Sequence, residues 1–278
     1  MWSLREHKMK RMSPVPGTER NDMALLQVDY KSKMLGRKVH FNVILPTDME
    51  EESHAPYPTL YLLHGIFGNS TSWLTSSCVQ RYAEDKGICV VMPDGENGFY
   101  VDHPDYMNRF SSWVGQELVE VTRKLFHLSD RREDTWLCGF SMGGYGALRN
   151  GLKYSDTFGK VIAFSGALIL DMPRTPQPGE GSPISSPYMK AMFGDMADAV
   201  SSDLNPAWIV RKLAAEEGKA LPDLYISCGE QDGLLEANQK FIGLLDELKI
   251  PYTWRTTPGG HDWDFWEQEI RHVIKNWL

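Results

Sequence analysis

The sequence predicts an α/β fold in which a mostly parallel central sheet is covered by helices on both faces. Two observations lead to this prediction. From about residue 59 to the end of the 278-residue chain, short apolar runs alternate with longer stretches of helical periodicity. Before them, residues 38–46 alternate apolar and polar side chains, which suits a half-solvated antiparallel strand near a sheet edge.

The strands are expected in a defined order along the chain. Residues 25–30 are candidates to pair with strand 38–46. Buried strands then follow at 59–63, 88–92, 135–138, 161–164, 224–227 and 252–255. Helices lie between them, and two have an apolar face with helical spacing. The first face consists of Val114, Leu118, Val121 and Leu125, and the second lies within residues 266–277.

The chain is expected to form one domain over residues 21–278, preceded by a flexible extension at residues 1–20. Residues 171–220 interrupt the alternation with a segment dense in Pro, Gly and Ser, which cannot continue a helix or a central strand. A long loop inside a compact domain is usually functional or disordered. We therefore expect a small cap-like insertion here, with a plain surface excursion as the alternative.

Composition and charge exclude several functional classes. The formal net charge is -8, whereas nucleic-acid binders usually present a basic face, so no nucleic-acid partner is expected. No apolar run approaches the roughly 20 residues of a membrane-spanning helix. The cysteines have no CxxC spacing, which disfavours a disulfide framework and a zinc site. The basic N-terminal residues are followed by no apolar run, so no signal peptide is predicted and a cytoplasmic location is expected.

The strongest chemical signal is the G-x-S-x-G pattern formed by Gly139, Ser141 and Gly143. An apolar strand precedes the pattern and a helix-compatible stretch follows it, as the nucleophile elbow of α/β-hydrolases requires. The serine would occupy a tight turn, and the flanking glycines let strand and helix approach closely. Ser141 is therefore the predicted nucleophile. The alternative is a glycine-rich turn with an incidental serine.

The general base is expected among the histidines that follow Ser141, because a serine hydroxyl is a weak nucleophile until a base accepts its proton. His272 falls within the last helix and is expected at the surface. His261 lies in a loop after a predicted strand, where Gly259 and Gly260 allow a sharp turn. His261 is the predicted base.

The acid is expected after a strand between the serine and the histidine. Asp232 follows the strand 224–227 and is the predicted acid, with Glu230 as second choice. Its role would be to fix the imidazole tautomer and stabilise the imidazolium without accepting the proton. A turn or helix-capping role is the alternative for Asp232.

The loop after strand 59–63 begins with His64 and Gly65, where this fold places one of its two oxyanion donors. The other donor is expected to be the backbone N–H of Met142, directly after the nucleophile. His64 precedes the serine in the chain, so a structural role in hydrogen bonding within the loop is predicted for it rather than that of the base.

These segments together resemble the esterase-D-like family of α/β-hydrolases, most closely its bacterial tributyrin esterases. The family also includes S-formylglutathione hydrolases, feruloyl and acetyl-xylan esterases, and mycolyltransferases. The resemblance covers roughly residues 25–278. It rests on YLLHGIFGN (61–69), VVMPDGENGFY (90–100), GFSMGGYGAL (139–148), FSGAL (164–168), CGEQD (228–232) and GGHDW (259–263).

The resemblance implies a single α/β-hydrolase domain that hydrolyses short-chain acyl esters through an acyl-enzyme, without a cofactor. No metal is expected, since HDWD at 261–264 lacks the spacing of a zinc helix motif. The expected partner is a small-molecule ester, and a homo-oligomer is left open. The implied site residues are the triad Ser141, Asp232 and His261, the oxyanion donors Ile66 (or Phe67) and Met142, and the substrate-binding or packing residues Trp73 and Trp263.

Several alternatives remain at this point. A feruloyl or acetyl-xylan esterase would differ in pocket shape, which the sequence does not reveal. S-formylglutathione hydrolases usually carry a cysteine in the oxyanion loop, and here none occurs before Cys78. Mycolyltransferases are secreted, and no export signal is predicted. The non-enzymatic alternative is an inactive hydrolase fold that serves as a binding module; the presence of Ser, Asp and His in the expected order argues against it.

Overall fold

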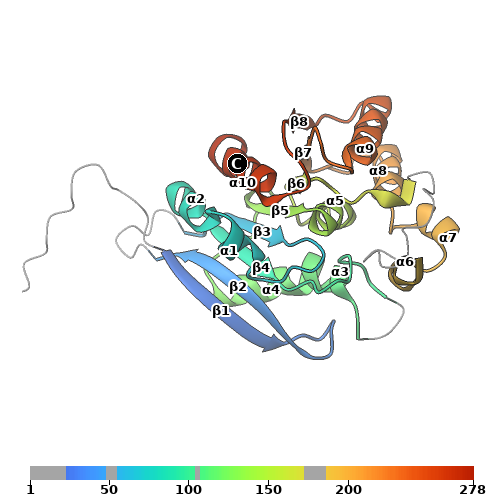
Figure 1. Ribbon diagram of the computed structural model, residues 1–278. Helices are drawn as coiled ribbons and strands as arrows, with labels where there is room; N and C mark the ends of the chain where they lie inside the picture. Colours follow the sequence, from blue (N-terminus) through green and yellow to red (C-terminus); the bar gives the residue numbers. More distant parts are fainter. Residues whose placement is uncertain (1–22, 48–54, 104–106, 172–185) are drawn as a thin grey trace, which may run out of the picture.

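A sheet with the strand order β1-β2-β4-β3-β5-β6-β7-β8 forms the centre of the molecule (Figure 1). The computed structural model describes residues 23–47, 55–103, 107–171 and 186–278. The strands are β1 (Met23–Lys31), β2 (Lys38–Pro46), β3 (Thr59–Leu63), β4 (Cys89–Pro93), β5 (Thr135–Phe140), β6 (Lys160–Phe164), β7 (Asp223–Gly229) and β8 (Thr253–Thr257). The pairs β1–β2 and β2–β4 are antiparallel and the others are parallel. The predicted α/β fold is confirmed.

Helices cover both faces of this sheet. They are α1 (Ser72–Ser76), α2 (Val79–Lys86), α3 (Phe110–Ser112), α4 (Leu118–Leu125), α5 (Met142–Lys153), α6 (Ser186–Phe193), α7 (Met196–Val200), α8 (Pro206–Ala215), α9 (Leu235–Leu248) and α10 (Trp263–His272). Short 3-10 turns span Arg132–Asp134 and Ile169–Asp171, and π-helical turns span Trp113–Glu117 and Val273–Trp277.

The central strands are mostly apolar because each of their faces meets a different cluster of buried residues. In β3, Tyr61 and Leu63 join the cluster that also contains residues of α3–α5 and α7–α9. Leu60 and Leu62 point the other way, into a cluster formed with α1, α2 and α10. Successive side chains of a strand alternate between faces, so a sheet covered on both sides favours apolar residues at successive positions.

The helical stretch at residues 114–125 differs from its prediction. Val114 and Leu118 are buried as expected, whereas Leu125 is 55% exposed and Thr122 is buried. The π-helical turn Trp113–Glu117 precedes α4. Such a turn is wider than an α-helical one, so the buried face does not continue with regular α-helical spacing.

The predicted cap-like insertion at 171–220 contains α6, α7 and α8, and its residues 172–185 lie outside the described residues, as does the predicted extension 1–20. α8 packs against α5 and α9. The hydroxyl of Tyr188 in α6 donates to the backbone carbonyl of Asn97, which places α6 beside the loop after β4. The cap role itself stays a prediction.

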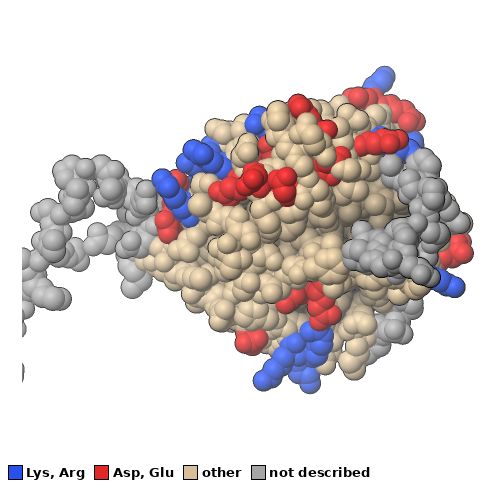
Figure 2. Space-filling model, in the orientation of Figure 1, with Lys and Arg blue, Asp and Glu red and all other residues tan. Residues whose placement is uncertain are grey.

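The described part of the chain contains no helix that is long and apolar enough to cross a membrane. Within the same residues, His, Cys, Asp and Glu side chains form no group that could hold a metal ion. On the face drawn in Figure 2, acidic side chains form separate groups and basic ones lie mostly near the margins, so the described surface visible from this side has no continuous basic area.

Candidate active site

Ser141, the predicted nucleophile, lies between the end of β5 and the start of α5. Its backbone angles are φ 56° and ψ -119°, a conformation that residues with a Cβ rarely adopt. The Ser141 N–H donates to the Phe164 carbonyl at 2.9 Å. The Ser141 carbonyl accepts from the N–H groups of Tyr145 and Ala167, both at 3.0 Å. Neighbouring segments thus hold the serine in this tight turn.

The glycines around Ser141 are required by close backbone contacts. A Cβ on Gly143 would lie 2.6 Å from the carbonyl oxygens of both Leu63 and His64. A Cβ on Gly139 would lie 2.4 Å from the carbonyl oxygen of Gly143. β3, β5 and α5 therefore approach one another more closely than any side chain would allow.

The predicted base and acid both lie next to Ser141. The Nε2 atom of His261, in the loop between β8 and α10, lies 2.9 Å from Ser141 Oγ. Its Nδ1 atom lies 2.9 Å from Oδ2 of Asp232, which follows β7. The side chain of His261 is 37% exposed and that of Asp232 is fully buried. The imidazole is thus open to an incoming molecule, and the carboxylate lies beneath it.

The ionisation of Asp232 settles which nitrogen of His261 carries the proton. Burial opposes ionisation, but hydrogen bonds from His261, the Ser165 hydroxyl and the Leu234 N–H outweigh it and hold the pKa of Asp232 below its usual value. An ionised carboxylate only accepts hydrogen bonds, so Nδ1 of His261 is protonated. In the neutral form of the ring, Nε2 is then the acceptor for the Ser141 hydroxyl. Glu230, the second choice as acid, is exposed.

The loop of residues 64–68, called the oxyanion loop below after its predicted role, lies beside the start of α5. It closes with a hydrogen bond from the Gly68 N–H to the Gly65 carbonyl at 3.1 Å. Met142 is the first residue of α5, where an N–H has no partner within the helix. The Phe67 N–H donates to Oδ1 of Asn97 at 2.8 Å. The Ile66 N–H makes no hydrogen bond with any described residue. Of the two predicted alternatives in this loop, only Ile66 therefore offers a free N–H.

His64 is 1% exposed, and both of its ring nitrogens are engaged inside the loops. Nδ1 donates to the Gly65 carbonyl at 2.7 Å, and Nε2 accepts from the Gly95 N–H at 2.9 Å. These bonds agree with the structural role predicted for His64.

The two tryptophans predicted at the substrate pocket pack against each other, with ring centroids 5.2 Å apart. Trp73 is 1% exposed, and its Nε1 donates to the Leu63 carbonyl at 3.0 Å. Trp263 is half-buried. The structure thus places Trp73 in the packing between α1 and α10, whereas a substrate contact for Trp263 stays a prediction.

Two residues next to the acid and the base were not predicted from the sequence. Ser165 is fully buried, has φ 48°, and accepts a hydrogen bond from Nε1 of Trp266 at 3.2 Å. The ring of Trp266 stands edge-on to that of His261, with centroids 5.0 Å apart. The serine-glycine pair directly after the predicted strand 161–164 is the signal that could have indicated Ser165.

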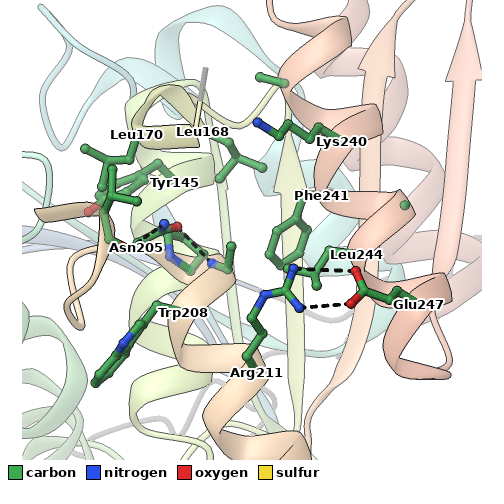
Figure 3. A pocket seen from close by; sticks show the side chains of 15 residues that line it. Tyr145, Leu168, Leu170, Asn205, Trp208, Arg211, Lys240, Phe241, Leu244 and Glu247 are labelled. Atoms are coloured by element: carbon green, nitrogen blue, oxygen red, sulfur yellow. Dashed lines mark hydrogen bonds and ion pairs between the residues drawn. The ribbon is translucent and has the colours of Figure 1, made fainter. Parts of the chain in front are cut away.

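A cavity of about 420 Å³ lies between α8 and α9, with Tyr145 of α5 in its wall (Figure 3). Its wall includes Leu168 and Phe241, and an ion pair between Arg211 and Glu247, 3.2 Å apart, belongs to its lining. Ser141, Asp232 and His261 are not among the lining residues. The cavity is therefore separate from the group of predicted catalytic side chains.

Comparisons with known proteins match nearly the whole chain. The family model Esterase, described as "Putative esterase", matches residues 32–275. An acetyl esterase from Caldicellulosiruptor saccharolyticus is 36% identical over 263 residues, which cover 92% of this chain and 98% of that protein.

Solved structures also match with high coverage. The apoenzyme structure of the S-formylglutathione hydrolase FrmB from Staphylococcus aureus is 28% identical in sequence, with a TM-score of 0.78. The match covers 91% of this chain and 98% of the FrmB chain. The substrate-bound structure of the fluorophosphonate-binding serine hydrolase F of the same organism is 28% identical in sequence, with a TM-score of 0.79. The match covers 91% of this chain and 97% of the hydrolase F chain.

Proposed function

This chain belongs to the Esterase family, and from that premise we propose that it is a serine carboxylesterase that hydrolyses short-chain acyl esters. Ser141 is the nucleophile, His261 the general base and Asp232 the acid that orients the base. One observation carries the proposal. The imidazole of His261 lies 2.9 Å from the Ser141 hydroxyl on one side and 2.9 Å from the Asp232 carboxylate on the other.

In the first half of the reaction, Ser141 Oγ bonds to the ester carbonyl carbon while its proton moves to Nε2 of His261. The negative charge that develops on the carbonyl oxygen is stabilised by the N–H groups of Ile66 and Met142. Asp232 stabilises the imidazolium through Nδ1–H and does not take its proton. The bond to the alcohol oxygen then breaks, this oxygen takes the proton from Nε2, and the acyl group stays on Ser141.

In the second half, water takes the place of the alcohol. His261 removes a proton from the water, whose oxygen bonds to the acyl carbon. The same two N–H groups stabilise the second oxyanion. The bond to Ser141 Oγ breaks, Oγ regains a proton from Nε2, and the carboxylic acid leaves. His261 passes the first proton to the alcohol and the second, taken from water, to Ser141 Oγ, so the enzyme ends the cycle unchanged.

The acetyl esterase relative, at 36% identity, supports a short acyl group. The likeness to an S-formylglutathione hydrolase favours a second candidate substrate, a short-chain thioester, which the same three residues would cleave. Feruloyl and acetyl-xylan esters are further candidates, since they differ from simple esters only in the groups around the scissile bond.

The role of Ser141 is tested with Ser141→Ala and p-nitrophenyl acetate. The variant should lose about 10⁴-fold or more in kcat, because residual catalysis would rest on the oxyanion donors and binding alone. A fluorophosphonate probe should label the wild type and not the variant. Ser201→Ala, at an exposed helix end, is the matched control and should keep full activity. Labelling or turnover by Ser141→Ala close to the wild-type level would refute the assignment.

The substrate class is tested with p-nitrophenyl esters from two to eight acyl carbons, tributyrin, methyl ferulate, acetylated xylan and S-formylglutathione. The proposal expects the highest kcat/KM on acyl groups of two to four carbons. A clear preference for S-formylglutathione, methyl ferulate or acetylated xylan would instead identify the corresponding alternative. Failure to turn over any substrate, together with no probe labelling, would indicate a binding module.

A further inference from the structure

The loop of residues 94–100, which follows β4, holds the oxyanion loop at three points. The Gly95 N–H donates to Nε2 of His64 at 2.9 Å, and the Tyr100 hydroxyl donates to the His64 carbonyl at 3.0 Å. The third contact is the hydrogen bond from the Phe67 N–H to Oδ1 of Asn97, at 2.8 Å. The first two contacts hold His64, at the base of the oxyanion loop. The third holds Phe67, at its tip.

The tip has a backbone conformation that its sequence does not favour. The hydrogen bond from Gly68 to Gly65 closes a four-residue turn with Ile66 and Phe67 at its centre. Phe67 has φ 63° whereas Ile66 does not have a positive φ, the pattern of a type II turn, which usually has Gly or Asn at the second central position. A bulky residue in this conformation costs about 1–3 kcal/mol and needs support from its surroundings.

That support comes from Asn97 rather than from packing of the Phe67 ring. Phe67 is 66% exposed, so burial of its ring contributes little to holding the turn. The Asn97 side chain accepts from the peptide N–H that changes direction between type I and type II turns. A rotation toward type I, which suits a bulky residue better, would break this hydrogen bond.

We propose that Asn97 is a positioning residue for the oxyanion hole: it fixes the turn at residues 65–68 and so fixes the position of the Ile66 N–H, which belongs to the same turn. This inference rests on the proposed function. Asn97 also removes the Phe67 N–H from competition as a donor, since that N–H is already bound. Oxyanion donors are effective because they are held in place before the charge develops, and Asn97 supplies this rigidity without touching the substrate.

Asn97 is itself well fixed. Its backbone carbonyl accepts from the Tyr188 hydroxyl of α6. The Gly98 N–H donates to the Gly95 carbonyl at 3.3 Å, and a Cβ on Gly95 would lie 2.1 Å from the Tyr100 ring. The loop 94–100 is therefore closely packed at Gly95 and Tyr100, whereas Asn97 itself is exposed and is held by hydrogen bonds. The bond to Tyr188 connects the loop to the predicted insertion.

The test is a double-mutant cycle of Asn97→Ala and Phe67→Gly. Asn97→Ala should lower kcat for p-nitrophenyl acetate about 10- to 100-fold, since a small misplacement of a catalytic group costs about this much, and KM should change less than about threefold. Glycine adopts positive φ without strain. In the Phe67→Gly background, Asn97→Ala should therefore lower kcat by less than about threefold. Asn69→Ala is the control. It removes a comparable side-chain acceptor, which accepts a hydrogen bond from the Thr71 N–H at 2.8 Å, and it should change kcat little.

A trifluoromethyl ketone supplies a second readout, because its adduct with Ser141 carries the oxyanion. Its inhibition constant should rise in Asn97→Ala in proportion to the fall in kcat/KM. An equal loss of kcat in both backgrounds, or an unchanged inhibition constant, would overturn the inference. If the proposed function were wrong, the wild type itself would show neither turnover nor inhibition, an outcome distinct from failure of the Asn97 role alone.

Discussion

At the scale of single residues, unusual backbone conformations gather around the candidate site. Of the seven described non-glycine residues with positive φ, six lie in its loops and the seventh, Lys249, ends α9. The six are Phe67, Glu96, Phe99, Tyr100, Ser141 and Ser165. Each such conformation costs roughly 1–3 kcal/mol and persists only where the surroundings enforce it. Here hydrogen bonds between neighbouring loops supply that enforcement, most clearly at Ser141 and Phe67.

Gly143→Ala should be destabilising and should abolish activity. The added methyl group would meet two backbone carbonyl oxygens at 2.6 Å, so α5 and the oxyanion loop must move apart. Such overpacking costs about 1–3 kcal/mol. Gly243→Ala in α9, where nothing lies within 4 Å, is the control and should stabilise the protein by about 0.5–1 kcal/mol. Urea unfolding and the p-nitrophenyl acetate assay measure both effects, and a fully active Gly143→Ala protein would disprove this account of the elbow.

The residues that the structure brings together at the site were partly accessible from the sequence. Ser141, Asp232 and His261 were predicted because each follows a recognisable strand in the order that this fold requires, and each has a glycine within two positions. Asn97 and Ser165 were not predicted. Their roles depend on hydrogen bonds between segments that only the folded chain brings into contact, and neither residue lies in a pattern with a defined period.

At the scale of elements, α5 is tied to the turn before α8 through a buried arginine. Arg149 is 1% exposed, and its guanidinium meets the Asp203 carboxylate at 3.0 Å and the Asp203 carbonyl at 2.7 Å. Lys153 reaches the same carboxylate at 2.7 Å. Because α5 begins at Met142, directly after Ser141, this ion pair joins the helix of the predicted nucleophile to the predicted insertion.

Asp203→Asn should lower stability in a pH-dependent way. Burial opposes ionisation of Asp203, but Arg149 and Lys153 outweigh it and hold its pKa below the usual value. A carboxylate with a lowered pKa contributes stability above its unfolded pKa, near 3.9, and this contribution is lost as the pH falls through the folded pKa. With the carboxylate 44% exposed, the variant should lose about 1 kcal/mol at pH 7.

Chemical unfolding of wild type and Asp203→Asn across pH 3 to 7 measures this difference. The difference in unfolding free energy between wild type and Asp203→Asn should be constant at neutral pH. It should close toward pH 3. Asp156 forms an ion pair with Lys219, and its own side chain is 81% exposed. Asp156→Asn should therefore leave stability unchanged. A gap that stays the same at every pH would show that the Asp203 charge does not stabilise the fold.

Most elements could be predicted from the sequence, because their signals are local. Strand 59–63 was predicted with the observed bounds, and strand 38–46, which lies between β1 and β4, was predicted by its alternation. The π-helical turn before α4 was not predicted, since a single wide turn leaves no period in the sequence. Likewise, α6–α8 lie in a segment whose Pro and Gly content indicated only an interruption.

At the scale of the whole molecule, the sheet separates two apolar clusters with different compositions. The cluster under α1, α2 and α10 is rich in aromatic rings, including Trp73, Phe140, Trp263 and Trp266. The rings of Phe140 and Trp266 stack with centroids 4.2 Å apart, and Trp266 in turn contacts His261. Packing on this side of the sheet therefore extends to the predicted general base.

Trp73→Phe should separate a packing role from a substrate-binding role. Loss of ring volume and of the hydrogen bond to Leu63 should lower the free energy of unfolding by about 1–3 kcal/mol. KM for p-nitrophenyl acetate should stay within about twofold of wild type. Trp208→Phe, at a half-buried position in α8, should cost less than about 1 kcal/mol. A large rise in KM at unchanged stability would instead assign Trp73 to substrate contact.

The uneven exposure of the three predicted catalytic side chains bears on the fate of the acyl-enzyme. Asp232 is sealed off and Ser141 is 8% exposed, so the accessible side of His261 is where a departing alcohol and an arriving water compete for the same nitrogen. An alcohol that stays bound there could attack the proposed acyl-enzyme, with His261 in place to accept its proton. In the proposed mechanism, the partition between hydrolysis and transfer to another alcohol would therefore depend on which molecule occupies that entrance, rather than on a different set of catalytic groups.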